Sequence, residues 1–238
     1  VSASKGGSGV LSNRNLWSMV SQNMGVHFGD NVELDGNGTY DVTADFGPVN
    51  TRLAGALADR SPDQQSVSIE MSFDQATLDE VPFERLDDRK GERDAVDPMS
   101  MEMRPSGQAP EKSAMPGRVL AEGTSGDATV LVTALDSVPA GVDGNGTYLA
   151  VSARTPYNHY PLPFMSLSAT LSRDGETVFE GDLTDTIHPD IAYHYGAVVD
   201  DVQSGDTLDL TVDAPPQISR HEGYETAFLS MDAMSMTV

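Results

Sequence analysis

Met19-Val20-Ser21-Gln22-Asn23-Met24-Gly25-Val26-His27-Phe28-Gly29-Asp30-Asn31-Val32 is the stretch that organises the chain. A degenerate copy returns later as His188-Pro189-Asp190-Ile191-Ala192-Tyr193-His194-Tyr195-Gly196-Ala197-Val198-Val199. The interval from the histidine to a glycine is 11 in both copies, and the interval to a proline is 21 in both, ending at Pro48 and Pro215. Shared spacing over roughly twenty residues indicates an internal duplication. The sequence therefore predicts two related β units, each carrying an aromatic-glycine turn behind a histidine.

The predicted fold class is all-β. Helical periodicity is scarce, and short alternating runs separated by Gly, Asp, Asn and Pro dominate, which is typical of sandwich-type domains. A short helix or turn is expected at 74–84. The expected strands are Leu16–Val20, Gly38–Phe46, Val67–Phe73, Gly117–Ala121, Ala128–Leu135, Tyr148–Ala153, Ser166–Ser172, Thr177–Asp182, Thr207–Val212 and Thr226–Met231.

The 238 residues suffice for two domains. The first β unit is expected at 1–84 and the second at 117–238, joined by a charged, proline-punctuated connector at 85–116. Val1-Ser2-Ala3 matches Leu167-Ser168-Ala169, yet only the second unit has further strands upstream of that point. The first unit is therefore predicted to lack its opening strands, unless a partner segment or a removed segment supplies them.

Charge and composition exclude several classes of protein. The net charge of -23 repels phosphate backbones, which argues against nucleic-acid binding. An acidic, lysine-poor but folded surface suggests a halophilic source, where salt screens the self-repulsion. Cysteine is absent, so disulfides and thiolate chemistry are excluded. No apolar run is long enough to cross a bilayer.

Two sequons, at Asn37 and Asn145, lie in a repeated Asp-Gly-Asn-Gly-Thr-Tyr hexapeptide. Asn-Gly also simply makes hairpin turns, and that interpretation suffices for both. The hexapeptide lacks the alternating Asp ligands and the distal Glu of a calcium loop.

No arrangement of nucleophile, base and acid is legible, so no enzymatic activity is predicted. Methionine and histidine are more selective, because thioethers suit Cu(I) and imidazole accepts copper, iron or zinc. The methionines at 99–103 and 234–236 are either ligands or core-filling residues. The candidate metal ligands are Met19, Met24, His27, His188, His194 and His221. A lone histidine beside glycine is also often a hydrogen-bonded turn residue.

The residues from Met19 through His27-Phe28-Gly29-Asp30-Asn31-Val32 to Gly38-Thr39-Tyr40-Asp41-Val42 resemble the periplasmic iron-transport-associated proteins of bacteria. The whole chain is similar to haloarchaeal secreted or lipid-anchored proteins that carry a diverged pair of such units. This resemblance implies two immunoglobulin-like sandwiches binding a copper or iron ion, in the service of ferrous iron transport. It assigns ligand roles to Met19 and His27, matches His194 to the same histidine, and likens His221 to a histidine of a distal loop. The early-strand ligands of that family have no match here.

Two functions are therefore expected. One is a cell-surface or secreted metal-binding protein, with any lipid anchor on a segment absent from this chain, that handles copper or iron beside a membrane transporter. The other is a structural surface protein of the same sandwiches that has lost its metal. A complete ligand set around His27 would discriminate between them.

Overall fold

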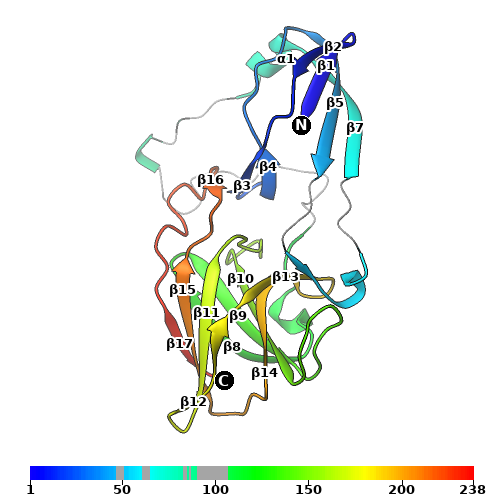
Figure 1. The fold of residues 1–238 in the computed structure, drawn as a ribbon. Helices are drawn as coiled ribbons and strands as arrows, with labels where there is room; N and C mark the ends of the chain where they lie inside the picture. Colours follow the sequence, from blue (N-terminus) through cyan, green and yellow to red (C-terminus); the bar gives the residue numbers. More distant parts are fainter. Residues whose placement is uncertain (47–50, 61–64, 83–84, 86, 90–106) are drawn as a thin grey trace. The chain divides into compact units, whose positions relative to one another are not determined.

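The protein is described by a computed structural model that covers residues 1–46, 51–60, 65–82, 85, 87–89 and 107–238. Figure 1 shows strands joined by turns, with very little helix. The chain divides into two compact units: unit 1 is Val1–Ser18, Phe28–Asn50 and Ser61–Val96, and unit 2 is Met19–His27, Thr51–Arg60 and Asp97–Val238. The connector expected at 85–116 lies largely outside the described residues, so its boundaries stay predictions.

Unit 1 contains one antiparallel sheet with the order β2-β1-β5-β7. Its strands are β1 (Ser2–Lys5), β2 (Ser8–Leu11), β5 (Gly38–Phe46) and β7 (Gln65–Phe73). A short helix, α1 (Gln75–Asp79), follows β7, and the 3-10 turn η2 (Asp87–Arg89) lies further on. The Asp74 carboxylate caps α1 by accepting a hydrogen bond from the Thr77 N–H at 3.2 Å. The strand expected at 38–46 and the helix expected after Phe73 are both confirmed.

Unit 2 is built around two larger sheets. One has the order β12-β11-β15-β17, and the other has the order β6-β13-β14-β10-β9-β8. The first comprises β11 (Ser166–Arg173), β12 (Glu176–Asp182), β15 (Thr207–Ala214) and β17 (Met234–Thr237). The second comprises β6 (Arg52–Leu53), β8 (Arg118–Ser125), β9 (Ala128–Leu135), β10 (Thr147–Arg154), β13 (Thr184–His188) and β14 (Ala192–Val199), with the 3-10 turns η1 (Gly55–Leu57) and η3 (Lys112–Ala114).

The core of unit 2 lies between these two sheets. Leu167 and Leu171 of β11 and Leu208 and Leu210 of β15 belong to one buried cluster with side chains of β9, β10 and β14. A second cluster, which includes Leu131 and Tyr148, covers the other side of β9 and β10. Because both faces are buried, these two strands read as nearly continuous apolar runs rather than alternating ones. The sandwich expected from the sequence is therefore present in unit 2.

A third sheet has the order β16-β3-β4 and comprises β3 (Trp17–Ser21), β4 (Gly25–Gly29) and β16 (Ser219–Arg220). It contains the first histidine hairpin, β3–β4, whose residues 19–27 belong to unit 2. The second histidine hairpin is β13–β14. In both hairpins the histidine, the aromatic residue and the glycine lie within a strand, so the expected aromatic-glycine turn is wrong. The turn comes before them, at 21–25 and 188–192, and ends at residues with positive φ, Gly25 (+68°) and Ala192 (+66°).

The duplication is visible in strand order and in register. The orders β2-β1-β5-β7 and β12-β11-β15-β17 correspond strand for strand. Ala3 pairs with Val42 in the first of these sheets, as Ala169 pairs with Leu210 in the second. Within the described residues, nothing in the first repeat corresponds to β8, β9 and β10, and β4 ends its sheet whereas its counterpart β14 pairs with β10.

The strand expected at 226–231 is wrong. These residues form turns, and Phe228 adopts a positive φ of 58°. The apolar alternation there arises because Ala227 and Phe228 enter the core from a loop, where the Phe228 ring packs against Tyr224 with centroids 5.4 Å apart. The strand that completes the sheet is β17, in which Met236 pairs with Leu208.

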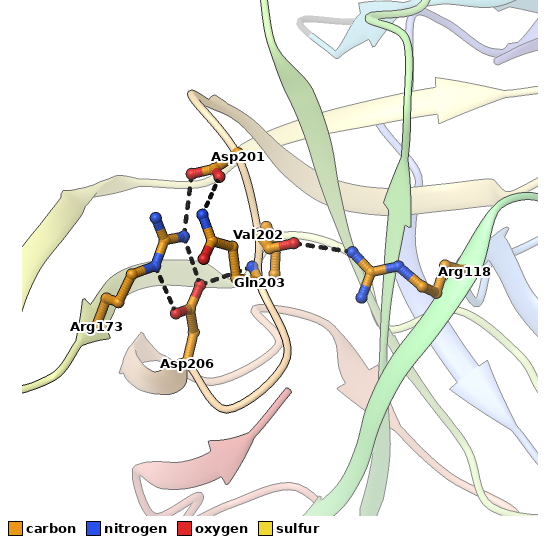
Figure 2. A network of polar contacts seen from close by, with 6 residues as sticks. All are labelled: Arg118, Arg173, Asp201, Val202, Gln203 and Asp206. Atoms are coloured by element: carbon orange, nitrogen blue, oxygen red, sulfur yellow. Dashed lines mark hydrogen bonds and ion pairs between the residues drawn. The ribbon is translucent and has the colours of Figure 1, made fainter.

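A polar network holds the turn between β14 and β15 (Figure 2). The Arg173 guanidinium donates to both oxygens of the buried Asp206 carboxylate at 2.9 Å and to Asp201 at 3.0 Å. The Gln203 N–H also donates to Asp206, and Arg118 donates to the Val202 carbonyl oxygen. Hydrogen bonds from Gln203 and Arg173 lower the pKa of Asp201, and those from Arg173 lower the pKa of Asp206. The network therefore ties β11 and β8 to the turn between β14 and β15.

Candidate metal centre

The candidate centre is formed where β16 joins the first histidine hairpin. Ser219 and Arg220 pair in parallel with Met19 and Val20. The parallel ladder continues past β16, because the His221 N–H donates to the Val20 carbonyl oxygen at 3.1 Å and the Gln22 N–H donates to the Glu222 carbonyl oxygen at 3.0 Å. This pairing brings a residue from the last 20 or so positions of the sequence beside a hairpin near its start.

The hairpin turn leaves no space for larger residues. A Cβ at Gly25, which has a φ of +68°, would lie 2.9 Å from Cε1 of Tyr160. The Asn158 side chain also donates to the Gln22 carbonyl oxygen at 3.2 Å. These contacts fix the direction in which β4 leaves the turn and therefore the position of His27.

His27 and His221 face each other through their Nε2 atoms, which lie 3.1 Å apart. The rings are T-shaped, with centroids separated by 5.1 Å. The Nδ1 atom of His27 is 3.0 Å from the Gly25 carbonyl oxygen, so Nδ1 carries the proton and Nε2 presents a lone pair. On the far side of the other ring, Nδ1 of His221 lies 3.7 Å from Oε1 of Glu222.

Two Nε2 atoms this close need either one shared proton or one shared cation between them. Two imidazole–metal bonds of about 2.0–2.1 Å, meeting at roughly 90–110°, would place the two nitrogens about 2.9–3.4 Å apart. The observed separation falls in that range. The Gly25 carbonyl oxygen behind His27 is also the kind of outer partner that orients a metal-binding histidine, whereas the Glu222 carboxylate lies beyond hydrogen-bond distance of His221. Oε2 of Glu222 is buried and has no hydrogen-bond partner among the described residues.

Met19 belongs to β3, the central strand of the sheet that contains His27. In the second hairpin, Thr186 pairs with His194, and the offset of 167 between His27 and His194 makes Met19 the counterpart of Thr186. The same register in the first hairpin would set the half-buried Met19 opposite His27. Met24 is an exposed residue of the turn, outside this arrangement. Within the described parts of the chain, no group of three or more His, Cys, Asp or Glu residues could hold a metal ion.

In the second hairpin, the position that corresponds to His27 is His194, and its ring is surrounded by other protein side chains. His194 is buried, its Nδ1 lies 3.0 Å from the Ala192 carbonyl oxygen, and its Nε2 lies 3.0 Å from the Tyr148 hydroxyl. Burial lowers the pKa of His194 to about 4, with smaller contributions in the same direction from His188 and Arg52. Both ring nitrogens therefore have protein partners, and the ring is neutral at physiological pH.

The short strand β6 is the counterpart of β16. Arg52 and Leu53 pair in parallel with Thr186 and Ile187, and the Ala54 N–H donates to the Ile187 carbonyl oxygen at 3.0 Å. Ala54 therefore occupies in the second hairpin the position that His221 occupies in the first. The first hairpin therefore has two facing imidazoles, those of His27 and His221. The corresponding positions of the second hairpin have one histidine, His194, together with Ala54 and Tyr148.

The remaining candidates lie elsewhere. His188 ends β13, where its Nδ1 accepts a hydrogen bond from the Asp190 N–H at 3.1 Å and its ring packs against Gly55. Met234 and Met236 of β17 pack against the core of unit 2. The methionines at 99–103 lie outside the described residues.

Sequence reasoning missed Glu222 and the role of β16. Ser219-Arg220 and Arg52-Leu53 have no residue type in common at matching positions. Only one signal in the sequence could have revealed that they are equivalent: each follows the histidine hairpin of its own repeat at the same distance.

Comparison with known protein families gives a match that covers most of unit 2. A family model described as a domain of unknown function, DUF7350, matches residues 113–237, which is just over half of the 238 residues. The chain belongs to the DUF7350 family. The DUF7350 region contains the second histidine hairpin and His221, whereas the first hairpin with His27 precedes it.

No curated protein matches the chain significantly. Among solved structures, FetP of uropathogenic E. coli strain F11, expressed in the periplasm of E. coli, is similar with a TM-score of 0.39 and 16% identity. That similarity covers 49% of this chain and 90% of FetP. In the described parts of the chain, no helix combines the length and the apolar character that a membrane span requires.

Proposed function

We propose that this DUF7350 protein binds a single copper or iron ion at the cell surface or in a secreted form, in association with metal uptake and without catalysis. The observation that carries the proposal is the 3.1 Å separation of the Nε2 atoms of His27 and His221. The two imidazoles would hold the ion, and the thioether of Met19 would be the third donor. A membrane transporter would be the partner that receives the ion.

The imidazole and thioether donors restrict which metal ions the proposed site would bind. Imidazole binds copper, iron and zinc, whereas a thioether adds affinity mainly for Cu(I). Carboxylate-rich sites favour hard cations such as magnesium and calcium, and the facing pair of imidazoles does not fit those ions. Copper is therefore the favoured ion, with ferrous iron as the second choice.

The alternative is a structural surface protein that has lost its metal. It is supported by the second hairpin, where Ala54 and Tyr148 occupy the corresponding place, and by the want of a third His, Asp or Glu donor among the described residues. In that case a shared proton, rather than a cation, joins the two imidazoles.

Metal titration separates the two functions. The purified chain is loaded with Cu(I), Cu(II), Fe(II) or Zn(II), and bound metal is measured by mass spectrometry after removal of the excess. We expect one copper per chain, and a loss of affinity of at least about tenfold in both His27→Ala and His221→Ala, because ligand removal costs more than the 10–100-fold of an outer partner. His159→Asn is the matched control, because it removes an imidazole from the loop after β10, and Asn tolerates the positive φ of 53° there.

Met19→Leu tests the third donor. It conserves size and apolar character but removes the thioether sulfur, so we expect weaker Cu(I) binding and unchanged Zn(II) binding. Metal content that is equal in the wild type, His27→Ala and His221→Ala would contradict the proposed function and favour the structural alternative.

A further inference from the structure

The first sheet of the chain has one apolar face and one polar face. Along β5, Tyr40, Val42, Ala44 and Phe46 point to one side, and the residues that alternate with them are Thr39, Asp41, Thr43 and Asp45. In β7, Ile69 pairs with Val42 and Val67 pairs with Ala44, so these side chains extend the same apolar face. A sheet with this pattern normally buries its apolar face against a second layer.

The apolar face is nevertheless open along β7 and at the end of β5. The exposed fraction is 57% for Ile69, 51% for Val67 and 55% for Phe46. Single exposed apolar side chains are ordinary, but a continuous group on one sheet face marks an interaction surface. Phe28 of unit 1 is also 63% exposed, whereas its counterpart Tyr195 is buried in the core of unit 2.

The second repeat shows what such a face binds. The corresponding face of the β12-β11-β15-β17 sheet carries Ala169, Leu208 and Leu210, and it packs against Val130 and Val132 of β9 and Leu149 and Val151 of β10. These strands reach the sandwich through β14, because β10 pairs antiparallel with it from Thr147↔Val199 to Val151↔Tyr195. In the first repeat the counterpart of β14 is β4, which has no further strand beside it in the described residues.

We propose that the apolar face of unit 1, formed by Val42, Phe46, Val67 and Ile69, binds a three-stranded antiparallel β segment of the same design as β8–β10, supplied from outside the 238 residues. Its inner strand carries alternating apolar residues toward Val42 and Ile69. The proposal is independent of metal binding, because it rests on unit 1.

Single cysteines can report coverage of the face, because the natural chain contains none. Ile69→Cys places the thiol on the apolar face, and Ser72→Cys places a matched thiol on the polar face of the same strand. In the chain alone, we expect a maleimide reagent to modify both variants at similar rates. Protection of Cys at position 69 that grows with protein concentration would mean that a second copy covers the face, and would overturn the proposal.

A covering segment can be provided from the chain itself. A copy of residues 113–165, which contains β8–β10, is fused ahead of Val1 through a flexible linker. We expect the modification rate at position 69 to fall about tenfold, as for a side chain that becomes buried in a stable sheet, with no change at position 72.

The docking-deficient control carries aspartate in the fused copy at the positions of Leu149 and Val151, and should restore fast modification at position 69. Circular dichroism verifies that each fusion is folded. An equal rate at position 69 with and without the intact fused segment would contradict the proposal.

Discussion

Leu210→Ala is expected to lower the free energy of unfolding of unit 2 by about 2–5 kcal/mol, the range for removal of a buried leucine side chain. Leu210 is 1% exposed and lies between the two sheets of unit 2, so truncation leaves a cavity that rigid strands cannot close. Ile69→Ala, on the corresponding face of unit 1, should change the stability by no more than about 0.5 kcal/mol, because the side chain is already in water.

Denaturant unfolding followed by circular dichroism measures both variants. The two units need not unfold together, so separate transitions are fitted if two appear. A loss above about 2 kcal/mol for Ile69→Ala would mean that the apolar face of unit 1 is covered in the isolated chain, because the cost of removing a side chain depends on what surrounds it. A small effect for Leu210→Ala would contradict the two-layer core.

Acidification from pH 6.5 to pH 4 is expected to destabilise the protein through His194 by about 3 kcal/mol, the free energy that corresponds to a pKa lowered from 6.5 to about 4. In this interval the unfolded chain binds a proton at His194 and the folded chain does not, so unfolding becomes more favourable as the pH falls. Well above pH 6.5 the histidine is neutral in both states, and its contribution is constant. The physical cause is burial of the ring against Tyr148.

His194→Gln removes the titrating group while keeping a polar side chain, so the slope of stability against pH between 4 and 6.5 should become much smaller. His159→Asn should retain the slope of the wild type. Asp201 and Asp206, whose pKa values are lowered, add destabilisation in the same direction at still lower pH, and that part should persist in both variants. An unchanged slope in His194→Gln would show that the ring is not a buried neutral group.

The metal proposal and the β-segment proposal concern different parts of the chain and can fail separately. The first depends on β3, β4 and β16, which bring together His27 and His221 in unit 2. The second depends on the face of β5 and β7 in unit 1. Loss of metal binding in His27→Ala leaves the cysteine experiment unaffected, and an uncovered face leaves the titration unaffected.

Alternation of apolar and polar residues determined most strands, because a half-buried strand requires period two whatever its neighbours are. The strand at 38–46 was predicted to the residue. The repeat spacing likewise determined that two equivalent hairpins exist, since strand lengths and turn lengths are local properties. The same rule failed at 226–231, where Ala227 and Phe228 are apolar because a loop carries them into the core.

What the tertiary structure alone decided is which side chains meet. His221 lies 194 residues from His27, and only the parallel pairing of β16 with β3 brings the two imidazoles together. The same kind of pairing, between β6 and β13, brings Ala54 to the second hairpin, so two similar sequences acquire different surroundings. Such pairing depends on main-chain hydrogen bonds, which any residue except proline can donate, and it therefore leaves no signature in the residue types of the short strands.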